Sequence, residues 1–454
     1  MAALLTALPL GAQTSYILTA SPSNVQSIVT NHGLTVVKEL FDGTNCVMLV
    51  TSPSTNVSGV ETEVDSDLRV ISFEPEQRAA LPELSSLTQP VLTQSSTSIL
   101  DGLPGRTLVS FFGSTVPSNY TTQTATSIIR LSDARAATNL TGNGVVAIID
   151  TGADPSHPAL VGVLVPGYDF TRNQAGSSEL LDLDPTVAAQ LQQSSTSILD
   201  AQNTLLLNTS AMAILNQSST SILDQSSTSI LDSSLAEFGH GTMTAGLVHL
   251  VAPTAKIMPL KAFRADGSSN LSDIIRAIYY AADNGANVLS MSFSIAQPSP
   301  GLQAAVQYAL SKNVILVAAS GNDGQKTLVY PASYNSVIGV GSSTNADLRS
   351  VFSNYGSGVV MFAAPGEGVV TTYPGNNYAA GWGTSFSTPM LAGSASLVLQ
   401  VRPTAKPGDV LNALSKTKQI SDMGYGRIDL YLSLTNLVSS TSTSGSSSGT
   451  KTTQ

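Results

Sequence analysis

The sequence of 454 residues is poor in cysteine and in charge, and each shortage excludes a class of protein. Cys46 is the single cysteine, so the chain cannot form an internal disulfide, a CxxC pair or a thiolate zinc cluster. Charged residues make up 11% of the chain, the net charge is -10 and no basic patch is present, which excludes nucleic acid as an expected partner. Low charge with abundant Ser and Thr is more common in secreted proteins than in cytosolic ones, and we expect secretion.

The sequence also lacks a long hydrophobic run. None reaches the roughly 18 apolar residues that a membrane helix needs, so no membrane span is expected. The first apolar run, residues 2–12, is shorter, and no Lys or Arg precedes it. Two interpretations stay open for residues 1–14, a truncated signal peptide and a buried first segment.

The order of apolar segments predicts two folded units. Residues 15–80 follow the order strand, helix, strand, strand, helix, strand, which predicts a small ferredoxin-like α+β unit. Residues 81–118 have the composition of a linker, and residues 437–454 that of a disordered tail. In residues 119–436 strands alternate with helices, which is typical of an α/β fold with a mainly parallel, doubly wound sheet. The strands expected in it are residues 145–149, 256–262, 288–292, 314–319 and 337–340.

An eight-residue repeat, QSSTSILD, interrupts this alternation within an expected insertion at about residues 172–237. Residues 193–232 form five consecutive octads, two of them degenerate, and one more copy lies in the linker at residues 94–101. Each octad would turn its apolar pair about 80° around a straight helix, so we expect short units separated by turns. Repeat expansion in a surface insertion and a role in processing or substrate access are both open. We expect the linker copy to pack against the tandem copies, as stacked repeats do.

Four short segments each place a polar side chain at a strand end or a helix start. Asp150 ends the expected strand at residues 145–149, and His240 opens a helix that we expect to be amphipathic. Asn322 follows a buried strand, and Ser385 lies on a glycine turn before a helix. Taken singly, each has an ordinary explanation as a turn former, a cap or a structural histidine. Together they place Asp, His, an amide donor and Ser on an α/β sheet in the chain order found in subtilisin.

Through DTG, HGT, SGN and GTSFSTP, residues 119–436 resemble the subtilisin-like serine proteases, or subtilases. The resemblance implies that Ser385 is the nucleophile, that His240 is the general base and acid, and that Asp150 orients the imidazole. It further implies an oxyanion hole made by the side chain of Asn322 and the backbone N–H of Ser385. We expect a monomer that acts on polypeptide substrates.

The same resemblance implies a substrate-binding edge and a specificity pocket. At the floor of the pocket Val329 stands where the family normally has Gly, which predicts a shallow pocket and small or medium apolar P1 residues. The substrate contacts implied by the resemblance are Ser292, Phe293, Ser294, Ala319, Ser320, Gly321 and Val329.

The N-terminal unit is similar to the inhibitory propeptides of subtilases. The resemblance therefore implies a zymogen that cleaves itself and whose first partner is its own propeptide. A permanently attached accessory domain is the alternative interpretation of residues 15–80.

Two departures from the family pattern concern calcium. Ala159 stands where many subtilases carry a calcium-binding Asp, and Leu250 leads straight into residues 251–253 without the usual calcium-binding loop. We therefore expect the strong calcium site to be absent, no metal ligand and no required cofactor. A weak calcium site elsewhere is left open.

Three rival functions were weighed against this prediction. Aspartic proteases share the signature Asp150-Thr151-Gly152 but need two such motifs, and the chain has no second one. An α/β-hydrolase needs Gly-x-Ser-x-Gly and the order Ser, Asp, His, and this sequence has neither around Ser385. A catalytically inactive binding module of the subtilisin fold is the alternative to the predicted secreted serine endopeptidase.

Overall fold

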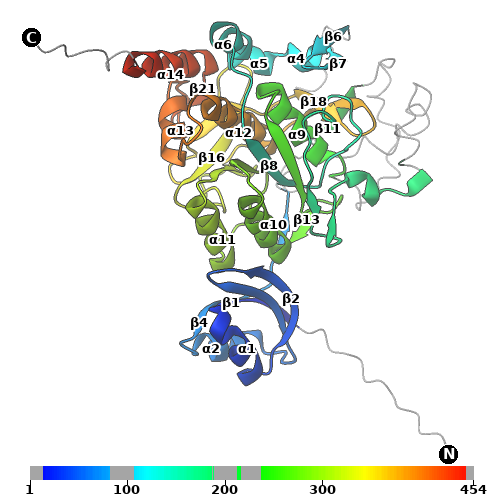
Figure 1. Cartoon of the computed structure of the whole chain (residues 1–454), viewed down its shortest axis with the longest axis vertical. Coiled ribbons are helices and arrows are strands. Elements are labelled where there is room, and N and C mark those ends of the chain that lie inside the picture. Colours follow the sequence, from blue (N-terminus) through cyan, green and yellow to red (C-terminus); the bar gives the residue numbers. More distant parts are fainter. Residues whose placement is uncertain (1–13, 82–106, 187, 189–211, 216–236, 446–454) are drawn as a thin grey trace, which may run out of the picture.

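The structure, a computed structural model, describes residues 14–81, 107–186, 188, 212–215 and 237–445. These residues form a small N-terminal unit, blue in Figure 1, and a larger α/β domain that lies against it. None of the helices in these ranges is both long and apolar enough to cross a membrane.

The N-terminal unit has the order of strands and helices expected for residues 15–80. Its elements are β1 (Thr14–Ala20), α1 (Pro22–Asn31), β2 (Thr35–Asp42), β3 (Cys46–Ser52), α2 (Val57–Asp65) and β4 (Val70–Pro75). The strands pair antiparallel in the order β2-β3-β1-β4. Side chains alternate along β1, so Tyr16 stacks on Phe73 inside the unit, whereas Ile17 joins the core of the larger domain. The α+β fold predicted for this unit is confirmed.

The larger domain is built on a sheet that contains every strand expected from the sequence. In spatial order, and within the described residues, its strands are β10 (Gln174–Ala175), β9 (Tyr168–Asp169), β12 (Lys256–Lys261), β8 (Val145–Asp150), β14 (Val288–Met291), β15 (Ile315–Ala319), β16 (Val337–Ser343), β17 (Phe362–Pro365), β21 (Arg427–Ile428) and β20 (Thr417–Lys418). Neighbours from β9 to β21 pair parallel. The pairs at the two edges are antiparallel. The mainly parallel sheet is confirmed.

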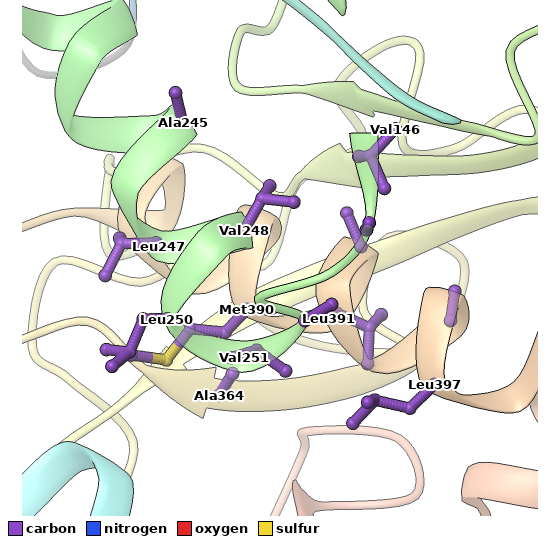
Figure 2. Packing of buried hydrophobic residues seen from close by; sticks show 14 of the residues in the cluster. Val146, Ala245, Leu247, Val248, Leu250, Val251, Ala364, Met390, Leu391 and Leu397 are labelled. Atoms are coloured by element: carbon purple, nitrogen blue, oxygen red, sulfur yellow. The ribbon is translucent and has the colours of Figure 1, made fainter. Parts of the chain in front are cut away.

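Helices cover both faces of this sheet, as a doubly wound fold requires. Among the described helices, α9 (His240–Val251) and α12 (Thr384–Val401) pack on one face, and α10 (Leu271–Asp283) and α11 (Pro300–Ser311) pack on the other. Side chains of β8 alternate between the faces, with Val146 in the layer of α9 and α12 and Ala147 in the layer of α10 and α11. Figure 2 shows the first layer, where Val146 lies near Val248 and Leu391.

The remaining elements complete the described part of the chain. They are β5 (Arg78–Ala80), β6 (Leu108–Phe111), β7 (Ser114–Pro117), α4 (Ser118–Thr121), α5 (Thr124–Ile128), α6 (Leu131–Thr138), the 3-10 helix η2 (Glu179–Asp182), β11 (Met212–Leu215), β13 (Ser268–Asn270), β18 (Val369–Tyr373), β19 (Asn377–Gly381), α13 (Pro407–Leu414) and α14 (Leu430–Gly445).

The expectation that the helix starting at His240 is amphipathic is wrong. All 12 residues of α9 are buried, because the sheet lies on one side of the helix and α12 and β18 cover the others. Hydroxyl groups from α4 and β18 bind its carbonyls: Tyr120 donates to the oxygen of Gly246 at 2.7 Å, and Thr372 donates to that of Thr242 at 2.7 Å. The helix that carries His240 is therefore enclosed on every side.

Two expected boundaries also need correction. The predicted linker includes the β6–β7 hairpin, whose Phe111 and Val116 are buried in the same core cluster as α9, so the domain begins before residue 119. The predicted tail includes the second half of α14, where Leu437 is buried and the helix packs on α6. Leu430, Leu434 and Leu437 recur at helical spacing and are buried in the core, so the packed helix continues past residue 436.

The octads fall mostly outside the described residues, including the linker copy at residues 94–101 and the expected packing of that copy on the array. One degenerate octad contributes β11, which pairs antiparallel with β19. The insertion therefore contacts the strand that leads toward Ser385.

His249, near the end of α9, makes the fold sensitive to acid. Its ring packs edge-on against Phe111, with ring centroids 5.2 Å apart. Burial, together with the nearby charge of Arg135 and the ring of His157, lowers the pKa of His249 to about 4. The unfolded chain takes up this proton near pH 6.5, so stability is lost as the pH falls from about 6.5 toward about 4.

We expect His249→Leu to reduce the loss of unfolding free energy between about pH 8 and about pH 5 by about 2 kcal/mol, because leucine fills similar space and takes up no proton. Urea unfolding at both pH values measures this, in a Ser385→Ala background that excludes self-digestion. Burial also lowers the pKa of His157. This histidine is present with and without the His249→Leu change, so part of the acid sensitivity should persist in the variant. If the unfolding free energy depends on pH identically with and without His249, this histidine is not a source of the acid sensitivity.

Candidate active site

Asp150 lies at the carboxyl end of the central strand β8. The strand is a β-branched run enclosed by the parallel strands β12 and β14, which suits a fully buried position. The Asp150 carboxylate is buried and accepts hydrogen bonds from the backbone N–H of Thr151 at 2.8 Å and the hydroxyl of Thr244 at 3.1 Å. These bonds hold the carboxylate in one orientation at the end of the strand.

His240 is the first residue of α9, and its Nδ1 lies 2.7 Å from Oδ1 of Asp150. Gly239 precedes it with a φ of 93°, and a Cβ at that position would lie 2.3 Å from the ring of Tyr373. Only glycine therefore suits this entry into the helix. The His240 ring also lies 5.3 Å, centroid to centroid, from that of Phe386, which brings the start of α9 beside the start of α12.

Ser385 is the second residue of α12. Its hydroxyl donates to the carbonyl oxygen of Ser292 at 3.1 Å, and the hydroxyl of Ser292 donates to the carbonyl oxygen of Ser385 at 3.0 Å. This reciprocal pair ties the helix start to the end of β14. In the first turn of a helix the backbone N–H groups have no intrahelical acceptor, which makes this position suitable for binding negative charge.

Asn322 follows β15 and is bound to the residue before Ser385. Its Oδ1 accepts hydrogen bonds from the backbone N–H and from the hydroxyl of Thr384, both at 2.9 Å. These two bonds fix which end of the amide faces Thr384, and the NH2 group is the opposite end. The four residues predicted for catalysis thus come from β8, α9, the turn after β15 and α12. Asp150 contacts His240, and His240 and Asn322 contact Phe386 and Thr384, the two neighbours of Ser385 in the chain.

The predicted substrate edge, residues 292–294, lies beside a strand from the N-terminal unit. The strand β5 pairs antiparallel with β13, and Ala80 forms an isolated antiparallel bridge with Ser294. The backbone N–H of Leu81 donates to the carbonyl oxygen of Gly267 at 3.0 Å. Residues 78–81 therefore run between β13 and the predicted edge as an extended chain.

The other predicted pocket residues lie close to this edge. Residues 319–321 are buried at the end of β15, directly before Asn322. Val329 is also buried, and the next residue, Tyr330, exchanges backbone hydrogen bonds with Ile295 at 2.8 and 2.9 Å. The structure thus places Val329 next to the predicted edge segment.

Glu179 is a buried carboxylate of this site that the sequence analysis missed. Its Oε2 accepts hydrogen bonds from the N–H of Gly239 at 3.1 Å and the hydroxyl of Thr151 at 2.9 Å. Its Oε1 accepts from the N–H of Thr242 at 3.1 Å and from the hydroxyl of the same residue. Burial raises the pKa of Glu179 to about 7, although the hydroxyl hydrogen bonds and the nearby Lys261 oppose this rise. No motif marks Glu179, because the insertion separates it by 60 residues from Gly239.

Lys261 is a second buried charge beside this site. Its Nζ donates to the carbonyl oxygens of Thr151 at 2.7 Å and Phe263 at 2.9 Å, and to Oδ2 of Asp182 at 2.6 Å. Asp182 also accepts from Arg172 at 2.5 Å. The ammonium of Lys261 is therefore bound by oxygens on three segments, and it fixes the turn that follows Asp150.

The residues at the family's strong calcium site do not fit a calcium ion. The methyl group of Ala159 is buried in the hydrophobic core and offers no oxygen. After α9, residues 252–255 connect directly to β12. The hard oxygen ligands that calcium needs are not supplied at these two positions. The expectation of weak calcium dependence stays a prediction.

Comparison with known proteins agrees with this geometry. The model of the subtilase family matches residues 142–445. A thermophilic serine proteinase of Bacillus sp. (strain AK1) is 35% identical over 296 residues, which are 64% of this chain and 61% of that relative. Thermitase of Thermoactinomyces vulgaris is 34% identical over 268 residues, which are 57% of this chain and 75% of thermitase. The crystal structure of fervidolysin from Fervidobacterium pennivorans matches with a TM-score of 0.65 and 20% identity, over 93% of this chain and 61% of fervidolysin, and shows the shared fold.

The fold and the family match define a subtilisin-like serine proteinase with an α/β domain. The chain belongs to the subtilase family. The resemblance inferred from the four motifs and the predicted fold class are thereby confirmed.

Proposed function

We propose that this subtilase is a secreted serine endopeptidase, made as a zymogen, that hydrolyses polypeptides with Asp150, His240 and Ser385. The observation that carries the proposal is the buried 2.7 Å contact between Asp150 and His240, beside a serine at the start of α12. A catalytically inactive binding module has no need of this buried charged contact, which takes two titratable groups out of water.

The proposed reaction follows from what each group can donate or accept. The hydroxyl of Ser385 turns from the carbonyl of Ser292 to Nε2 of His240, which takes its proton as the oxygen attacks the peptide carbonyl. Asp150 accepts a hydrogen bond from the Nδ1–H of His240 and stabilises the imidazolium, which then protonates the leaving amine. The Asn322 NH2 group and the backbone N–H of Ser385 bind the oxyanion. All these groups belong to the protein, so we propose that no cofactor is required.

The N-terminal unit is proposed to be the inhibitory propeptide. Its strand β5 occupies the predicted substrate edge as an extended chain, in the way a peptide substrate binds by strand addition. The carboxylate of Glu74 accepts from the N–H of Gly301 at 2.7 Å at the start of α11. The carboxylate of Glu76 accepts from the N–H of Ser272 at 3.0 Å at the start of α10. These contacts seat the unit where it blocks the cleft until the chain is cut.

Two further properties belong to the same proposal. Secretion is supported by the low charge and by a composition with one cysteine, which lies in the unit that maturation would remove. The branched side chain of Val329 beside the edge segment supports a preference for small or medium apolar P1 residues. The mature enzyme is proposed to act as a monomer.

Ser385→Ala tests the proposed function and the self-cleavage together. We expect the variant to hydrolyse no peptide and to keep the N-terminal unit covalently attached, because the nucleophile that cuts the chain is lost. Mass spectrometry of the purified protein gives the intact mass and the cleavage site. Ser394→Ala is the matched control, since this buried serine of α12 donates only within its helix, to Met390 at 2.7 Å. Normal processing in pure Ser385→Ala would refute self-cleavage.

Asn322→Ala tests the proposed oxyanion hole. We expect kcat to fall by roughly 100- to 1,000-fold with little change in KM, because the hydrogen bond strengthens as the oxyanion forms. Steady-state kinetics on a chromogenic peptide separate the two constants. A variant whose KM rises while kcat is unchanged would show that Asn322 binds the ground state instead.

A further inference from the structure

We propose that Glu179 is a positioning residue for His240, and that its carboxylate also stabilises the charged form of this histidine. The inference rests on the proposed proteolytic function and adds a residue outside the triad and the oxyanion hole. The inference is based on the position of Glu179 between the strand that ends in Asp150 and the helix that begins with His240.

Glu179 binds the start of α9 through both of its carboxylate oxygens. One carboxylate oxygen accepts from the N–H of Gly239, just before His240, and the other accepts from the N–H of Thr242, two residues after it. Both N–H groups belong to a helix start, where intrahelical acceptors are missing. The carboxylate therefore fixes the backbone on both sides of the catalytic histidine.

Glu179 is also linked to the end of β8. The hydroxyl of Thr151 donates to Glu179 at 2.9 Å and accepts from the N–H of Gly241 at 2.9 Å. Thr151 directly follows Asp150 and donates its own N–H to the Asp150 carboxylate at 2.8 Å. Glu179 thus joins the backbones that carry the two partners of the 2.7 Å contact, and catalysis depends on such contacts within a few tenths of an ångström.

The negative charge of Glu179 also acts on His240. Because His240 is the first residue of α9, the positive end of the helix dipole opposes the imidazolium that forms during catalysis. Where Glu179 is ionised, at about pH 7 and above, its carboxylate at the same helix end offsets that dipole. Glu179 has no solvent exposure, and the hydrogen bonds from the start of α9 offset the cost of burying its charge.

Other charged and titratable groups face this region from the surrounding elements. Asp150 on β8 contacts His240 directly, and Glu237 lies just before α9. Tyr373 on β18 has a pKa raised by burial and by the nearby carboxylates of Glu179 and Glu237. Lys261 on β12 contributes the one positive charge among these groups, and it is bound to Asp182. Removal of the negative charge of Glu179 therefore leaves the imidazolium of His240 less stable.

The experiment compares Glu179→Gln, Glu179→Asp and a matched control in the full-length protein after maturation. Asp169→Asn is the control, because Asp169 is a fully buried carboxylate with hydrogen bonds to Thr171 at 2.6 Å and to Arg172 at 3.0 Å, on β9. The measurements are kcat and KM on a chromogenic peptide from about pH 5 to about pH 10, and thermal melting.

For Glu179→Gln we expect kcat to fall by about 10- to 100-fold, KM to stay within about twofold, and the acid limb of kcat/KM to move to lower pH. Glu179→Asp keeps the charge but cannot reach both Gly239 and Thr242, so kcat should fall while the acid limb stays in place. Asp169→Asn should melt at a lower temperature and keep the wild-type kcat and pH profile.

The outcomes separate the inference from the proposed function. A wild-type protein that hydrolyses no peptide refutes the proposed function itself. An active wild type whose Glu179→Gln variant behaves like Asp169→Asn, with only the melting temperature changed, overturns the role of Glu179. Should Glu179→Gln not be recovered as folded protein, Glu179→Asp decides: a lower kcat with an unmoved acid limb supports the role, and a wild-type kcat overturns it.

Discussion

The hydrogen bond between Asp150 and His240 joins the end of β8 to the first residue of α9, and the surrounding structure holds this junction in place. The backbones meet without a side chain between them, since a Cβ on Gly241 would lie 1.9 Å from the carbonyl oxygen of Gly152. The far end of α9 is also bound, because the guanidinium of Arg135 donates to the carbonyl oxygens of Leu250 and Val251. The helix therefore cannot shift along its axis without breaking buried contacts at both ends.

Carboxylates at helix starts recur throughout the molecule. Glu179 binds the start of α9 from within the domain, whereas Glu76 and Glu74 bind the starts of α10 and α11 from the N-terminal unit. Each uses the same physics, in which unsatisfied N–H groups and the positive end of a dipole attract negative charge. The first of these contacts is internal to the domain, and the other two join the domain to the N-terminal unit. The same interaction thus orders the candidate site and holds the two units together.

The sequence predicted the parts of the fold that depend on local pattern. Continuous apolar runs such as residues 145–149 identified the parallel strands, and four short motifs predicted the candidate catalytic residues that the structure brings into one region. The burial of α9 was not predictable, because the cover over its polar face comes from β18, more than 100 residues later. Glu179 was missed for a related reason: its partners lie beyond the octad insertion, and the short η2 carries no periodic signal. The hairpin at residues 108–117 was missed because its two strands have only four residues each and lie in a stretch rich in Ser, Thr, Pro and Gly.

The most direct test of the account asks whether Asp150, His240 and Ser385 act as one unit. The matured protein is treated with a fluorophosphonate, and the labelled peptide is located by mass spectrometry. Because an activated serine hydroxyl reacts selectively with this reagent, the account predicts one adduct, on Ser385, and its loss in His240→Ala that the wild-type enzyme has matured in trans. Absence of the adduct in the folded wild type, or labelling of Ser385 at an equal rate without His240, would contradict it.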